Sequence, residues 1–118
     1  LDAVAFERAE LERIGLPPGV GVNHRATHFQ HLFAGSGYAA GYYVYLWAEV
    51  LDADGYQAFV EAGDAFDPEV AARLRRYIYG AGNSREPGEA YRAFRGRNPH
   101  IEPMLRQRGL VDDVAPAP

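Results

Sequence analysis

Glycine and proline divide this 118-residue chain into short segments, and within most segments the apolar residues recur at helical spacing. No stretch alternates polar and apolar residues for long, so strands are expected to be scarce. With 47% hydrophobic residues, the chain is long enough for one modest core and too short for two comfortable domains. The sequence therefore predicts an all-α fold with one helical unit over residues 1–110 and a flexible tail over 111–118.

Cap and stop residues predict where the helices begin and end. Asp67 followed by Pro68 is the clearest start, because aspartate accepts hydrogen bonds from the first amides of a helix and proline fits its first position. This helix should end at Gly80. The other expected helices are residues 2–14, one turn over 29–33, a long helix from Tyr38 to Phe59 or Gly63, a helix capped by Ser84 with Pro87 in its first turn that ends at Phe94 or Gly96, and 101–108. The long helix has an alternative break near the turn residues 52–55, and the residues expected to face inward are Val4, Ala5, Leu11, Ile14, Val70, Leu74, Tyr77 and Ile78.

The segment 35–47 holds four of the eight tyrosines and three glycines. Read as a helix at about 100° per residue, it places Tyr38, Tyr42 and Tyr45 on one stripe and leaves an apolar back that includes Trp47. A phenol joins a large rigid ring to a hydrogen-bonding tip, so such a stripe can hold a polar ligand. Ordinary packing of the same rings stays open as an alternative.

Charge and cysteine content restrict the class of protein. Residues 1–72 carry three arginines against eleven acids, whereas residues 73–118 carry nine against five. Because those arginines are spread over several segments, we expect them to be solvated or paired within the chain, and we expect no nucleic-acid partner. The absence of cysteine excludes disulfides and thiolate metal sites. No run is long enough to span a membrane, so we expect a cytoplasmic protein without a membrane partner, and a start without methionine suggests a piece of a longer chain.

Three other groups could carry chemistry. His24, His28 and His31 lie close in sequence, but a zinc helix usually spaces its histidines by four with a glutamate after the first, so a hydrogen-bonding role is favoured and no metal ligand is predicted. The carboxylates of Glu49, Asp52 and Asp54 could pair, although solvation at a helix surface is the simpler reading. No nucleophile triad and no phosphate-binding glycine loop are present.

The segment HLFAGSGYAAGYYVYLWAEVL over 31–51 strongly resembles the C-terminal part of the thimet oligopeptidase family of zinc metallopeptidases, and within it the bacterial peptidyl-dipeptidase (dipeptidyl carboxypeptidase) branch. The similarity continues through 82–84, 91–97 and 103–110. The family's His-Glu-x-x-His zinc helix and its further glutamate ligand do not occur in this sequence. The resemblance therefore implies the last part of a larger enzyme whose zinc is held outside this chain.

The resemblance also implies roles for individual residues. Tyr45 would hydrogen-bond the oxyanion that forms during peptide cleavage, and Tyr38 would contact the scissile region when the cleft closes. Tyr42 and His31 match further substrate-contacting positions, and Gly35 and Gly37 belong to the glycine-rich loop that lies across the cleft from the metal. If these glycines form a hinge, closure of the loop could exclude water from the reaction. His31 and Tyr38 are one residue farther apart than in the family, so the loop is longer here.

The sequence thus predicts the inactive C-terminal part of a zinc metallopeptidase that acts on short peptides. Its partners would be the peptide and the remainder of the parent enzyme, and the isolated chain could self-associate through surface normally covered by that remainder. The alternative is a free-standing helical module that binds peptides or another protein.

Overall fold

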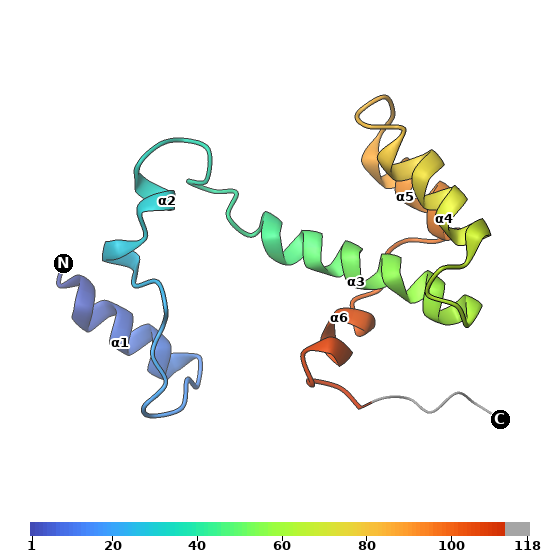
Figure 1. The fold of residues 1–118 in the computed structure, drawn as a ribbon. Coiled ribbons are helices and arrows are strands. Elements are labelled where there is room, and N and C mark those ends of the chain that lie inside the picture. The colour runs from blue at the N-terminus through green and yellow to red at the C-terminus, as the bar shows by residue number, and fades with distance from the viewer. Residues whose placement is uncertain (113–118) are drawn as a thin grey trace. The chain divides into compact units, whose positions relative to one another are not determined.

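The computed structural model describes residues 1–112 and is helical, with no strand among these residues. The elements are α1 (Ala3–Arg13), η1 (Ala26–His28), α2 (Gln30–Phe33), α3 (Val44–Ala62), α4 (Pro68–Leu74), η2 (Arg75–Tyr79), α5 (Pro87–Arg95) and α6 (Glu102–Gln107). They form two compact units, residues 1–43 and the residues from Val44 on (Figure 1). The all-α prediction is confirmed. Most of the predicted tail, residues 113–118, lies outside the described residues.

The first unit has no fully buried residue. Its helix α1 matches the predicted segment: Asp2 Oδ1 accepts hydrogen bonds from the N–H groups of Val4 and Ala5, and Ile14 caps the other end. The prediction that Val4, Ala5 and Ile14 face inward was wrong, because all three are exposed. Leu11 is half-buried. The reason is that α1 packs chiefly on the short η1 turn, which offers little surface to cover an apolar face.

The second unit is built around α3, with two apolar clusters on different faces of that helix. Ala58 joins Val70 of α4 and two residues of α5, Tyr91 and Phe94, and Val50 and Ala53 meet Met104 of α6. Figure 1 accordingly shows α6 on another side of α3 from α4 and α5. Val70 is buried as predicted, and Leu74, Tyr77 and Ile78 pack half-buried against the first cluster.

Helix ends in the second unit mostly follow the local signals. Asp67 Oδ1 accepts from the N–H of Val70 at 2.8 Å, and Pro68 is the first residue of α4, as predicted. The helix continues through the π-helical turn η2 to Gly80. The cap of α5 is a correction, because Glu86 Oε2, not Ser84, accepts from the N–H of Glu89 at 2.8 Å. The longer glutamate side chain lies directly before Pro87 and so replaces the serine three residues away.

The start of the long helix differs from the prediction, whereas its middle follows the predicted continuous helix and not the alternative break. The helix begins at Val44, because residues 34–43 form bends and turns, and the glycines of that segment disfavour helix by about 1 kcal/mol each. It then continues unbroken through 52–55 to Ala62, where Gly63 takes a φ of 75°. Ala53 and Asp54 are buried there, so packing outweighs the local turn preference. Within residues 1–112, no helix is both long and apolar enough to cross a membrane.

Candidate functional site

Three of the predicted site residues meet in the first unit. His31 lies on α2, and Tyr38 and Tyr42 lie in the bends and turns that follow. Their ring centroids are 5.7 Å apart for His31 and Tyr38, 5.5 Å for His31 and Tyr42, and 5.4 Å for Tyr38 and Tyr42, all near edge-to-face. We call these three residues together with Phe29 the aromatic cluster. The cluster brings an imidazole and two phenols side by side, although these side chains do not lie on one face of a helix.

Phe29 is the member of the aromatic cluster that was not among the predicted site residues. Its ring is 4.6 Å from that of Tyr42 and 5.8 Å from that of His31, and it stacks on His24 at 5.1 Å. The position was expected only to open a short helical turn. The sole signal in the sequence is its place two residues before His31.

A hollow of about 340 Å³ lies beside this cluster. It is lined by Gln30, His31, Ala34, Gly35, Gly37 and Tyr38. Neither Gly35 nor Gly37 has a positive φ, and a Cβ at either position would meet no atom within 4 Å. These glycines therefore keep the space next to the hollow clear of side chains. Their backbone conformation is not one that only glycine can adopt.

Tyr45 belongs to the second unit, where it is the second residue of α3 and is 55% exposed. The predicted stripe through Tyr38, Tyr42 and Tyr45 was wrong, because the first two precede the helix. The predicted apolar back was also wrong for Trp47, which is exposed. The start of α3 instead presents a run of exposed apolar and aromatic residues over 43–47.

The three carboxylates at the middle of α3 have different surroundings. Glu49 accepts two hydrogen bonds from Arg108, which hold the pKa of that carboxyl below its usual value. Asp52 is exposed, as expected. Asp54 has no exposed surface, so the prediction of a solvated side chain was wrong at this position.

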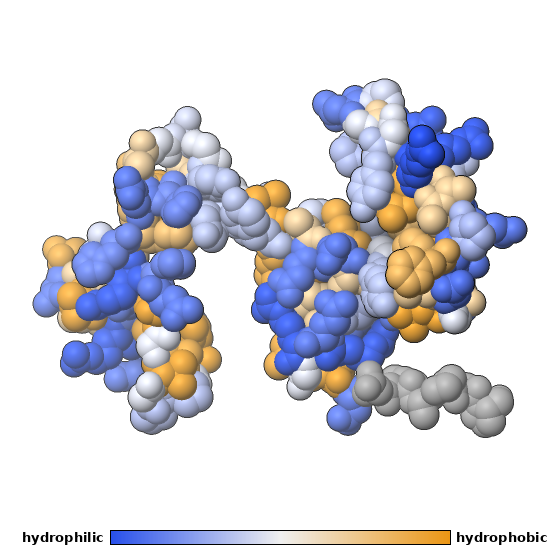
Figure 2. Space-filling view, viewed as in Figure 1, coloured by the Kyte–Doolittle hydropathy of each residue, from blue (hydrophilic) through white to orange (hydrophobic). Residues whose placement is uncertain are grey.

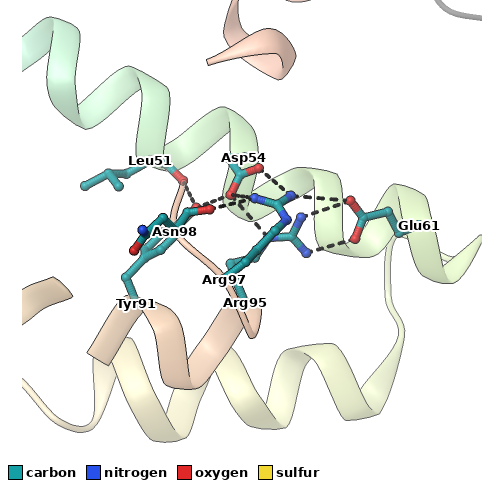
Figure 3. Close-up of polar contacts among 7 residues, drawn as sticks. All are labelled: Leu51, Asp54, Glu61, Tyr91, Arg95, Arg97 and Asn98. Atoms are coloured by element: carbon teal, nitrogen blue, oxygen red, sulfur yellow. Dashed lines mark hydrogen bonds and ion pairs between the residues drawn. The ribbon is translucent and has the colours of Figure 1, made fainter. Parts of the chain in front are cut away.

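Asp54 lies at the centre of an ionic network that joins α3 to α5 and the turn after it (Figure 3). Its carboxylate accepts hydrogen bonds from the Tyr91 hydroxyl at 2.6 Å, from both terminal nitrogens of Arg97 at 2.8 and 3.1 Å, and from Arg95 Nε at 3.3 Å. Arg95 in turn donates to both carboxylate oxygens of Glu61 at 2.9 and 3.0 Å. Arg95 and Arg97 of the second half of the sequence thus pair with acids of the first half, in line with the expected pairing within the chain.

The pKa shifts show that this network is ionised and structural. Burial raises the pKa of Asp54, but the hydrogen bonds from Arg97, Tyr91 and Arg95 together outweigh burial and lower it. The hydrogen bonds from Arg95 lower the pKa of Glu61. Burial and the neighbouring Asp54 carboxylate raise the pKa of Tyr91. A carboxylate whose pKa is lowered stays ionised at neutral pH, which suits a structural ion pair between α3 and α5.

Metal binding finds no support in the described part of the chain. Within residues 1–112, no three side chains of His, Cys, Asp or Glu are grouped so that they could hold a metal ion. His24 and His31 instead make ring contacts with Phe29.

Known proteins match most of this chain. The family model "Peptidase family M3" matches residues 4–110. The chain is 50% identical over 108 residues to a dipeptidyl carboxypeptidase of Salmonella typhimurium, covering 92% of this chain and 15% of that protein. It is 47% identical over 93 residues to a dipeptidyl carboxypeptidase of Escherichia coli (79% and 13%), and 49% identical over 89 residues to an oligopeptidase A of Haemophilus influenzae (75% and 13%). The chain thus spans no more than about a sixth of the length of these relatives.

Proposed function

This chain belongs to peptidase family M3, and we propose that it forms the C-terminal, substrate-contacting part of a zinc metallopeptidase of the peptidyl-dipeptidase or oligopeptidase type. The observation that carries the proposal is the 50% identity to a dipeptidyl carboxypeptidase over 92% of the chain. The aromatic cluster supports it, because its hydrogen-bonding rings meet as a compact group within residues 4–110, the range that the family model matches. The substrates would be short peptides.

In this proposal the aromatic cluster binds the peptide. The imidazole of His31 and the hydroxyl of Tyr42 would hydrogen-bond polar groups of the peptide backbone, and Tyr38 would contact the region of the scissile bond. The hollow next to Gly35 and Gly37 leaves room for the peptide and for movement of the loop. Closure of that loop would exclude water from the bound peptide.

Tyr45 is proposed to donate a hydrogen bond to the oxyanion that develops on the attacked carbonyl. A donor fixed before the reaction stabilises the transition state more than the ground state, and one such donor is typically worth about 3 kcal/mol. The rigid helix α3, anchored by the buried Asp54 nine residues farther along, is a suitable support for such a donor.

Zinc enters this proposal only through the parent enzyme. Within residues 1–112 no group of His, Cys, Asp or Glu side chains could hold a metal ion. In the proposal the zinc is held by other polypeptide of the parent, where it would supply an activated water. The chain alone is therefore expected to be inactive. Its own contribution would be limited to binding the peptide and stabilising charge.

The remainder of the parent enzyme is the second proposed partner. The run over 44–47 at the start of α3 is apolar and exposed, and Figure 2 shows hydrophobic side chains at the surface of the second unit. Without a cover, this surface would favour self-association of the isolated chain. We propose the cytoplasm as the compartment, which fractionation of cells that produce the protein would test.

Tyr45→Phe in the full-length protein is the direct test, with Tyr43→Phe as the matched control because Tyr43 is an exposed phenol two residues away. Loss of the donor should lower kcat for a short peptide by about 100-fold to 1,000-fold with little change in KM. The control should stay within about twofold of the wild type. An unchanged kcat in Tyr45→Phe would remove Tyr45 from the mechanism, and a full-length protein without zinc-dependent peptide hydrolysis would refute the whole proposal.

A free-standing helical peptide-binding module is the alternative function. The hollow beside His31 and Tyr38 favours it, because this cavity is formed entirely within the first unit. Micromolar binding of short peptides by the 118-residue chain alone, without any hydrolysis by a longer protein, would decide for this alternative.

A further inference from the structure

Phe29 occupies a backbone position that is held on both sides. It lies between η1 and α2, its N–H donates to the carbonyl of Ala26 at 3.4 Å, and its carbonyl accepts from the N–H of Leu32 at 3.1 Å. The residue is half-buried in a unit that has no fully buried residue. The backbone of Phe29 is thus tied by one hydrogen bond to η1 and by one to α2.

The ring of Phe29 contacts two predicted peptide-binding side chains at once. It meets Tyr42 at 4.6 Å with an angle of 78° between the planes, and His31 at 5.8 Å with an angle of 63°. Both arrangements fall in the edge-to-face range that the ring quadrupole favours. On another side, His24 stacks on Phe29 at 5.1 Å and 22°.

Such contacts matter because the backbone alone gives little orientation to Tyr42. Tyr42 lies in a turn before α3, where no regular helix fixes the direction of its side chain. His31 is on α2, which has only four residues. An aromatic ring that contacts both side chains restricts the angle between the imidazole and the phenol.

We propose that Phe29 is a positioning residue that holds His31 and Tyr42 in the arrangement required to bind the peptide. The inference rests on the proposed function, in which those two side chains contact the peptide. Phe29 itself has no polar side-chain atom and would act only through its neighbours. Its removal should therefore weaken peptide binding and leave the chemical step nearly unchanged.

The test is the kinetics of Phe29→Leu in the full-length protein with a short peptide and added zinc. Leucine keeps an apolar side chain but has no ring, so kcat/KM should fall about tenfold, mainly through KM, which corresponds to about 1.4 kcal/mol. Phe29→Tyr, which keeps the ring, should recover most of the loss. Phe33→Leu is the matched control, because Phe33 belongs to the same helical turn and is 73% exposed. It should stay within about twofold of the wild type.

A double-mutant cycle separates positioning from a general loss of structure. If Phe29 acts through Tyr42, Phe29→Leu should cost less than about threefold in KM when Tyr42→Phe is already present. The same tenfold loss in both backgrounds, or an equal loss in Phe33→Leu, would overturn the inference. If circular dichroism shows that Phe29→Leu is unfolded, Phe29→Met replaces it in the same cycle. An active wild type with an unaffected Phe29→Leu variant refutes the role of Phe29 alone, whereas an inactive wild type refutes the proposed function and the inference with it.

Discussion

Replacing the buried carboxylate of α3 should be among the most damaging single changes in the second unit. Asp54 has no exposed surface and accepts hydrogen bonds from Tyr91, Arg95 and Arg97. In Asp54→Ala all these donors lose their acceptor at once. The side chain of Arg95 is only 4% exposed, so water cannot readily replace the carboxylate, and Glu61 remains as its counter-ion.

The degree of burial determines the expected magnitude. An exposed ion pair contributes about 0–1 kcal/mol, whereas removal of one partner from a buried pair typically costs about 3–5 kcal/mol because a charge is left uncompensated. We expect Asp54→Ala to lie at the lower end of the second range, about 3 kcal/mol, because Glu61 still pairs with Arg95 and Arg97 while the Tyr91 hydroxyl loses its buried acceptor. Since small domains are stable by only about 5–15 kcal/mol, the variant should lose a large share of its stability.

Urea unfolding followed by far-ultraviolet circular dichroism would measure the free energy of unfolding. Asp52→Ala is the matched control, because Asp52 lies on the same helix and is exposed, and it should change that free energy by no more than about 0.5 kcal/mol. Tyr91→Phe removes the hydroxyl that lies 2.6 Å from Asp54 and 3.3 Å from the Leu51 carbonyl, and it should cost about 1.5–3 kcal/mol, which keeps the test informative if Asp54→Ala does not fold. Equal unfolding free energies for Asp54→Ala and Asp52→Ala would refute the reasoning.

Three further predictions concern the acid stability of the Asp54 network, the end of α5 and the ion pair between Arg108 and Glu49. Because the pKa values of Asp54 and Glu61 are lowered in the folded state, the stability they contribute is fully present above their unfolded pKa values of about 3.9 and 4.3 and is lost as pH falls through the folded values. The urea midpoint should thus be nearly constant from neutral pH down to about pH 5 and decrease below about pH 4, and a midpoint that rises on acidification would contradict this. Gly96→Ala should cost about 1–2 kcal/mol in urea unfolding, because Gly96 ends α5 with a φ of 76° and a Cβ there meets no neighbour, so only backbone strain contributes; an unchanged midpoint would count against it. Arg108→Ala breaks an exposed pair with Glu49 and should shift the thermal midpoint only slightly, with the shift vanishing in high salt; a large, salt-independent loss would show that the pair is more important than its exposure indicates.

The ends of several helices could be predicted from the sequence because their causes are local. Asp67 caps α4 from a position directly before Pro68, and Gly63 and Gly96 end their helices with positive φ values. Each of these signals involves a side chain or a missing side chain within a few residues of the helix end. The same reasoning failed for the cap of α5, where a glutamate competes with a nearby serine.

The burial of Asp54 could not be predicted because its causes are distant in sequence. Its partners follow it by 37 to 43 residues, and nothing near Asp54 indicates that they will meet it. Turn-forming residues over 52–55 suggested a break in the helix. The stretch is helical, and the burial of Ala53 and Asp54 there shows that packing against distant segments outweighs the local turn preference.

The candidate site shows the same division between chemistry and geometry. The hydrogen-bonding chemistry of His31, Tyr38 and Tyr42 could be predicted, since a phenol or an imidazole has the same hydrogen-bonding groups in any fold. Their arrangement was not predicted, because a helical period was assumed across a segment with three glycines. A helix through Tyr38 and Tyr42 would fix them one turn apart along an axis, whereas the turns let both rings approach His31 to within 5.7 Å. The glycines that disfavour the helix are therefore a condition for the aromatic cluster.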